Sequence, residues 1–162
     1  MTTQPIFARL KADHDRHRDL LDRIDATQGD SPERAELFET FRIEVTAHAA
    51  SEEMSLYAAM LGRSDLRDEA QHSVAEHKEI DDLLTELYEM DFGSTGWLTR
   101  FRTMKDRYLH HIEEEEEEMF PEAAEGLSGA RKKELAEIFE RAKPKEKARA
   151  AAEEPSSEHA RE

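Results

Sequence analysis

The chain has 162 residues, of which 38 % are charged, and its net charge is −16. This length is typical of a single domain with its own core, and the strongly acidic balance argues against binding nucleic acid or an anionic membrane. The absence of cysteine excludes disulfides, thiolate zinc sites and cysteine-ligated iron–sulfur clusters. Neither a membrane-spanning run nor a secretory signal pattern is present, so we expect a cytoplasmic protein.

The first half of the chain predicts two long helices. Apolar residues at steps of three and four follow Pro5 and continue until Gly29. A second start signal comes directly afterwards, with Ser31 as the N-cap and Pro32 at the first helical position. This second helix is expected to end near Gly62.

Two further long helices follow with the same periodicity. The third is expected to be capped by Ser64 or Asp65 and to end before a loop at residues 91–96. The fourth begins near Trp97 and is expected to be interrupted at Pro121 or Gly126. The short loops favour an all-α, antiparallel, up-down-up-down four-helix bundle.

A short fifth helix is predicted to open at Ser128 and to end near Lys143. The remaining residues, 144–162, are charged and rich in alanine and contain no large apolar side chain. We therefore expect a bundle domain over residues 1–143 and a disordered tail over residues 144–162.

Two His-x-x-x-Glu units are the strongest functional signal in the sequence. They are His48 with Glu52 and His111 with Glu115. Residues four apart share one face of a helix, so each unit directs an imidazole and a carboxylate to the same side. Imidazole with carboxylate suits iron or manganese, and two carboxylates can bridge a pair of metal ions.

The other two long helices each supply a histidine at the same level of the bundle. His77 lies about as far from its two neighbouring turns as His48 and His111 do, to within ~2–3 Å at ~1.5 Å per residue. His14 fits less closely, with an offset of ~6 Å. The sequence thus predicts a di-metal site whose ligands are His14, His48, Glu52, His77, His111 and Glu115.

Several nearby residues have open or lesser roles. His17 shares the face of His14 and is interpreted as a ligand, a partner of a ligand or part of a pocket wall. Tyr108 is expected to be a core tyrosine, with a metal ligand as the alternative. Glu53 is expected to accept a hydrogen bond near the site, whereas the rest of the acidic run at 113–118, together with His72 and His110, is expected to face solvent.

The same residues resemble the hemerythrin-like, or HHE cation-binding, domain family over residues 5–140. The resemblance is carried by Asp13-His14, His48 to Glu53 with Leu56-Tyr57, Glu76-His77, and His111 to Glu115 with Met119-Phe120-Pro121. It implies a non-haem centre of two iron ions, Fe2+ or Fe3+, with an oxo bridge as one of its states. In this family pattern Glu52 and Glu115 bridge the metals, and the four histidines are terminal ligands.

One departure from the family bears on function. Oxygen-carrying hemerythrins have a fifth histidine four residues before the position of His77, and here that position is Ser73. The leading hypothesis is a protein that binds or senses dioxygen or a related small oxidant. Removal of hydrogen peroxide or nitric oxide, an iron-responsive interaction module and a metal-free bundle are the alternatives, so enzymatic activity stays open. The sequence indicates no particular protein partner.

Overall fold

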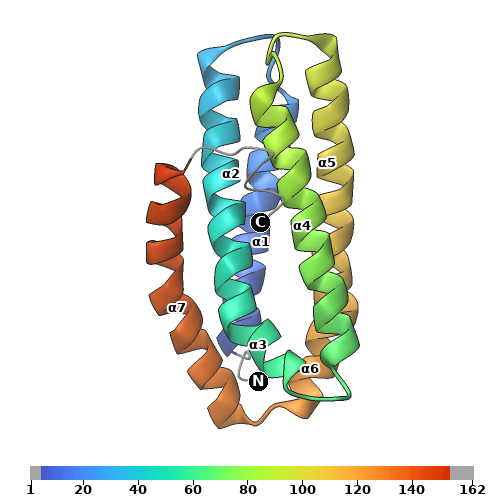
Figure 1. Ribbon diagram of the computed structural model, residues 1–162, viewed down its shortest axis with the longest axis vertical. Coiled ribbons are helices and arrows are strands. Elements are labelled where there is room, and N and C mark those ends of the chain that lie inside the picture. Colours follow the sequence, from blue (N-terminus) through green and yellow to red (C-terminus); the bar gives the residue numbers. More distant parts are fainter. Residues whose placement is uncertain (1–4, 154–162) are drawn as a thin grey trace.

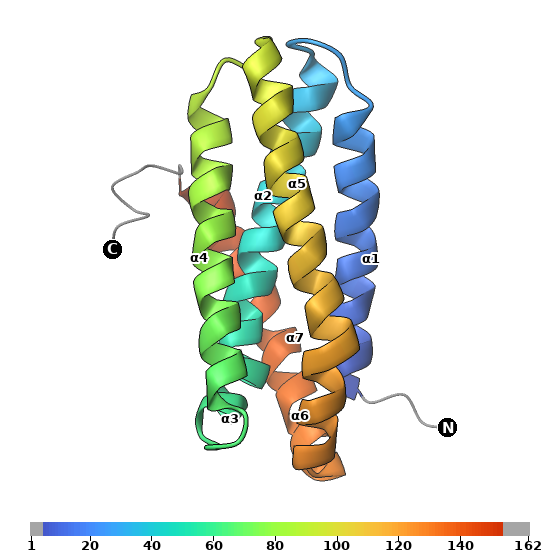
Figure 2. The same cartoon turned by 90° about the vertical axis from the view of Figure 1, so that its right-hand side faces the viewer.

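The computed structural model describes residues 5–153, and within that range the chain is helical without strands (Figure 1). Four long helices run antiparallel and side by side, as Figure 2 shows. They are α1 (Pro5–Asp25), α2 (Pro32–Glu52), α4 (Arg67–Glu89) and α5 (Thr95–Glu114). The predicted all-α, up-down-up-down bundle is confirmed.

Serine side chains cap three of the helices. Ser31, Ser94 and Ser128 each accept a hydrogen bond at 3.1 Å from the backbone N–H three residues later, which satisfies one of the free donors of the first turn. The predicted cap of the third helix at residues 64–65 is wrong. That helix, α4, follows Leu66 and has no side-chain cap.

Each His-x-x-x-Glu unit lies directly beside a wider turn of helix. A π-helical turn, η1 (Glu53–Tyr57), follows Glu52 and leads into α3 (Ala58–Leu61). A second one, η2 (Glu115–Met119), follows α5 and leads into α6 (Phe120–Gly126). Pro121 occupies the first turn of α6 and does not end the helical path, which stops at Gly126. Single π turns of this kind are frequent at functional sites.

The fifth helix is present but longer than the sequence predicted. It is α7 (Gly129–Ala152), so residues 144–152, expected to be disordered, continue the helix. Lys143 and Ala150 are buried on its inner side, and the Arg42 guanidinium of α2 donates to the Ala150 carbonyl at 3.2 Å. Pro144 removes one backbone donor inside the helix, and Figure 1 shows α7 bending as it follows α2. Residues 154–162 lie outside the described range.

Two apolar clusters fill the interior and lie at different levels of the bundle. One surrounds Trp97 and Phe101 towards the α1–α2 and α4–α5 loops, and the other surrounds Leu56 and Phe120 towards α3 and α6. The layer between them contains buried polar side chains, which are Asp13, His14, His17, His48, Ser51, Glu52, Ser55, Ser73, His111 and Glu115. Apolar packing above and below therefore holds a polar layer across all four long helices.

Candidate metal centre

The structure brings the six predicted ligand residues together in this polar layer. Each long helix supplies one or two of these residues, and the start of η2 supplies one. Five of the six are buried, and His77 is the most accessible, with 8 % of its side chain exposed. They are His14 on α1, His48 and Glu52 on α2, His77 on α4, His111 on α5 and Glu115 on η2. The ~6 Å offset of His14 expected from the turn positions does not keep it away from the others.

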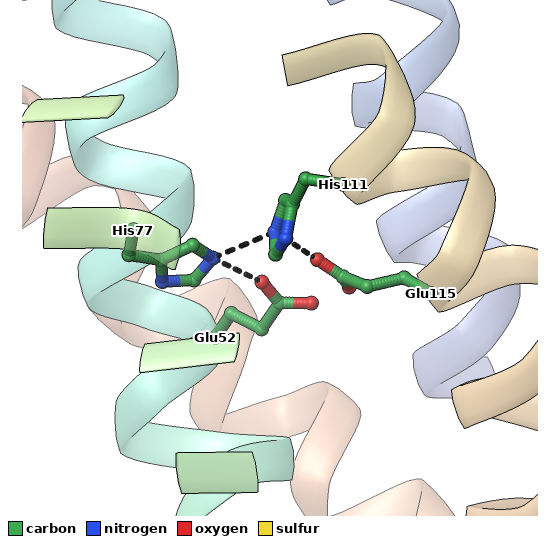
Figure 3. A group of neighbouring side chains, drawn as sticks. All are labelled: Glu52, His77, His111 and Glu115. Atoms are coloured by element: carbon green, nitrogen blue, oxygen red, sulfur yellow. Dashed lines mark hydrogen bonds and ion pairs between the residues drawn. The ribbon is translucent and has the colours of Figure 1, made fainter. Parts of the chain in front are cut away.

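One group of donors lies between α2, α4 and α5 (Figure 3). His77 Nε2 is 3.1 Å from His111 Nε2 and 3.3 Å from Glu52 Oε1, and His111 Nε2 contacts Glu115 Oε1. Ligand atoms about 2.1 Å from one ion, at right angles, lie about 3 Å apart. These separations therefore suit side chains that share one metal ion.

A second group of donors lies beside the first. Atoms of His14, His48 and Glu52 are all within 4.8 Å of one another, and His48 Nε2 is 3.7 Å from Glu52 Oε1. Glu52 belongs to both groups, so its carboxylate lies between two clusters of imidazoles. This is the arrangement that a bridging carboxylate requires.

The outward-facing nitrogen of each histidine is held by a polar partner. In every case the partner contacts Nδ1, which directs Nε2 toward the interior of the layer. The Nδ1 partners are Glu116 for His14 at 2.7 Å, Tyr108 for His17 at 2.6 Å, Asp13 for His48 at 2.8 Å, Glu53 for His77 at 3.2 Å and Glu76 for His111 at 2.9 Å. The predicted contact of Glu53 is confirmed.

Several inward-facing atoms are left without any hydrogen-bond partner among the described residues. They are Nε2 of His14, His17 and His48, both carboxylate oxygens of Glu52, of which Oε1 has only ion-pair contacts with His48 and His77, and Oε2 of Glu115. Burying such groups unpaired costs about 1–3 kcal/mol each. Because the atoms are all donors that bind transition metals well, the side chains present fit a metal centre that would satisfy them.

Protons would compete with a metal cation for several of these buried side chains, as the shifts of their pKa values show. Burial and the nearby Glu115 hold the pKa of Glu52 well above its usual range. Burial also opposes ionisation of Glu115, but the charge of His111 outweighs it and holds the pKa of Glu115 well below its usual range. Burial lowers the pKa of His48 to about 4 despite its bond to Asp13, which leaves it neutral and able to bind a metal. For His111 burial opposes the charge, but Glu115 and Glu76 outweigh it and raise the pKa to about 10.

His17 is fully buried, and its ring lies against that of His48 with centroids 5.1 Å apart. Its Nδ1 contacts the Tyr108 hydroxyl, while its Nε2 has no partner among the described residues. His17 therefore presents an unpartnered imidazole nitrogen beside His48. Tyr108 is a buried core tyrosine whose hydroxyl bonds His17, which matches the prediction for it.

The sequence interpretation missed two residues of the layer. The Tyr57 hydroxyl donates to Glu115 Oε1 at 3.0 Å and lies 3.5 Å from His77 Nε2. In an α-helix, position 57 would be about 140° away from Glu52, at ~100° per residue. The wider turn of η1 changes that direction, and no sequence signal announced it. Glu116 was expected to face solvent, but it bonds His14 and Arg18.

A cavity of about 410 Å³ between α2 and α4 reaches this layer. Its walls include the apolar side chains of Val45, Val74 and Leu84, and it is also bordered by His48 and His77. A small neutral molecule could therefore reach the imidazoles from this side.

The contact between Asp13 and His48 gives a prediction. Burial opposes ionisation of Asp13, but His48, Lys143 and Arg9 hold its pKa well below the usual range, so it is a carboxylate. Asp13→Asn removes the charge that orients the imidazole of His48, and we expect metal affinity to fall about 10–100-fold in a chelator competition titration. Asp15→Asn is the control, since that side chain is 77 % exposed on the same helix. Equal affinities in the two variants would contradict the role of Asp13.

Comparison with known proteins agrees with this geometry. The family model described as the hemerythrin HHE cation binding domain matches residues 6–123. A crystal structure of a hemerythrin HHE cation binding domain-containing protein from Mycobacterium kansasii is similar, with a TM-score of 0.78 and 25 % identity. The similarity covers 88 % of this chain and 87 % of that one. No curated protein matches. With the family model covering most of the sequence and the metal-binding side chains gathered in one layer, the chain belongs to the hemerythrin HHE cation-binding domain family, whose members bind metal cations.

Proposed function

We propose that the protein is a non-haem di-iron protein that binds or senses dioxygen or a related small oxidant. The centre would be held by the six predicted ligands, with Glu52 and Glu115 as carboxylate bridges and the histidines as terminal ligands. The observation that carries the proposal is the position of Glu52, which belongs to two groups of donors at once. A set of four or more imidazoles with carboxylates favours iron over magnesium or calcium and leans to iron over manganese.

The residues of this chain would control the centre in two ways. The Nδ1 partners fix the direction of each imidazole, and the two apolar clusters limit the water that reaches the layer. The negative charge of both bridges would be balanced by the bound cations, which removes the cost of two buried carboxylates. Iron, when bound, supplies the electrons that a bound oxidant accepts.

A second candidate is the removal of hydrogen peroxide or nitric oxide at the same centre. Two observations favour it over simple oxygen carriage. Ser73 occupies the position of the fifth histidine of oxygen carriers, and the cavity between α2 and α4 gives a small molecule access to His48 and His77. A metal with fewer protein ligands has room for an exogenous one.

Ser73→His tests the idea of an open coordination position. Ser73 is buried on α4, one turn before His77, with its hydroxyl 3.9 Å from Met119 Sδ. A histidine there would add a ligand, so we expect more reversible dioxygen binding and about tenfold slower peroxide consumption, the scale on which changes around a metal alter activity. Ser73→Ala, which keeps the position open, should behave like the parent protein. If Ser73→His changes neither reaction, no open coordination position of the metal lies next to residue 73.

The proposed function is tested by mixing the reduced, iron-loaded protein separately with dioxygen, hydrogen peroxide and nitric oxide. Reversible spectral change with dioxygen supports binding or sensing, whereas repeated consumption of peroxide or nitric oxide supports the enzymatic candidate. The Glu52→Ala and Glu115→Ala variants should lose either response. A protein that carries iron but responds to none of the three molecules would contradict both candidates.

A further inference from the structure

A second, smaller pocket opens between α4 and α5. It has a volume of about 220 Å³, and six of its nine lining residues are carboxylates. Among the described residues that line it, none is lysine or arginine. The carboxylates are Asp68, Glu69, Glu76, Glu114, Glu115 and Glu118. A pocket with this lining attracts cations and repels anions.

The mouth of this pocket holds a set of donors that suits a divalent cation. Ligand atoms of His72, Glu76 and Glu114 lie within 4.8 Å of one another. His72 Nε2 is 3.5 Å from Glu76 Oε1 and 4.0 Å from Glu114 Oε2, and the His72 side chain is 65 % exposed. An imidazole beside two carboxylates is a donor set of the kind that the buried layer uses, but in contact with solvent.

The floor of the same pocket is part of the buried layer. Glu115 lines the pocket, is 1 % exposed, and has its Oε2 without a partner among the described residues. Glu76 connects the mouth of the pocket with its floor. Its Oε1 faces His72 and also accepts a hydrogen bond from His111 Nδ1 at 2.9 Å. An ion held at the mouth would thus be separated from the inner donors by a short path lined with oxygen atoms.

Ser73 also lines the pocket, and it is buried. A larger side chain at this position would take up part of the pocket. The negative charge in the pocket is dense: burial, and then the neighbouring carboxylates of Glu122 and Glu118, raise the pKa of Glu69 to about 7. The cavity on the α2 side has mainly apolar walls, so the two openings differ in the chemistry that they admit.

We propose that the pocket between α4 and α5 is the route by which divalent metal ions reach the buried centre, and that His72, Glu76 and Glu114 form an outer site that binds the ion first. The inference rests on the proposed two-metal centre, and it assigns metal and oxidant to different faces of α4. The outer site is a weak one, since His72 is exposed and the two carboxylates are only partly buried, and its ion moves on to the stronger inner donors.

The test measures how fast the metal-free protein takes up Co2+, whose visible absorption bands report the inner coordination. In the double variant His72→Ala/Glu114→Gln, Glu76 and Glu115 remain, because both contact His111. With limiting Co2+ we expect uptake to slow on the order of tenfold, the lower end of the range for electrostatic steering. The final amount of Co2+ per chain and its spectrum should not change, because the inner donors are intact.

Glu89→Gln is the matched control, since it removes one negative charge at the far, exposed end of α4. Uptake by this control at the parental rate supports the route. Equal rates in the double variant and the parent would overturn it, and so would equal slowing in the control, because general surface charge would then explain the effect. If the parent binds no Co2+ at all, the two-metal centre itself fails along with the route.

A second measurement examines the outer site directly. Mn2+ added to protein whose inner centre is already filled should broaden the NMR signals of the His72 ring in the parent protein. The Glu114→Gln variant should lose most of this broadening. Equal broadening of the His72 ring in the parent and in the variant would show that no outer site exists.

Discussion

Glu52→Gln is expected to reduce bound metal from about two ions per chain to fewer than one, while the melting temperature of the metal-free protein changes by no more than about 2 °C. Glu52 is fully buried and its pKa is raised, so in the metal-free protein it carries a proton much of the time. Glutamine has nearly the same shape and no charge, and therefore it replaces that neutral form well. It cannot bridge two cations, because an amide is a poor and uncharged ligand.

The two readouts separate a metal-binding role for Glu52 from a structural one. Glu36→Gln is the control, because Glu36 is exposed on the same helix and should affect neither readout. Metal content is measured by elemental analysis after gel filtration, and the melting temperature by circular dichroism after treatment with a chelator. If the Glu52→Gln variant binds as much metal as the parent protein, Glu52 is not a ligand of the centre.

Removal of the metal is expected to lower the melting temperature of the parent protein by about 10 °C. A metal present at about 1,000 times its dissociation constant stabilises the folded state by about 4 kcal/mol, and a domain of this size shifts by roughly 2–4 °C per kcal/mol. Helicity at 25 °C should remain, because the two apolar clusters on either side of the polar layer do not depend on the metal.

Circular dichroism before and after chelation makes this measurement. An unchanged melting temperature would mean that no metal is bound to the folded chain. A complete loss of helicity on chelation would instead favour the alternative in which iron binding folds an interaction module.

The prediction from sequence succeeded where helical geometry alone decides the outcome. His48 and Glu52 share a face because they are four residues apart, and equal distances from the turns place His77 and His111 at the same level. His14 lies beside the other predicted ligands although its estimated offset was larger. That estimate used only the rise per residue, which ignores helix tilt and uneven loops. The same periodicity was sufficient for the order and direction of the four bundle helices, but not for the length of α7.

The remaining features depend on interactions that no periodicity reveals. The wider turns at η1 and η2 reset the direction of later residues, which is why the position of Tyr57 beside Glu115 was missed. The extension of α7 to Ala152 depends on contacts with α2. Lys147 pairs with Glu44 at 2.8 Å, and Arg42 donates to the Ala150 carbonyl at 3.2 Å, so residues that resemble a solvated tail are held by side chains of α2.

The α7 helix also reaches the polar layer. Phe139 lies against the ring of His48 with centroids 5.7 Å apart, and Lys143 neutralises the carboxylate that holds the same imidazole. Both residues lie beyond the segment that the family model matches, which ends at residue 123. The environment of His48 is therefore completed by a part of this chain that lies outside the matched domain.

The most direct test of the central claim is the metal content of the protein produced in iron-supplemented medium, together with its absorption spectrum before and after addition of dioxygen, azide and peroxide. We expect about two irons per chain, as carboxylate-bridged sites in helical bundles hold, and charge-transfer bands that change with at least one of these small molecules. A folded protein that binds no iron under these conditions would contradict this claim, and the histidines would then be polar residues of an ordinary bundle core.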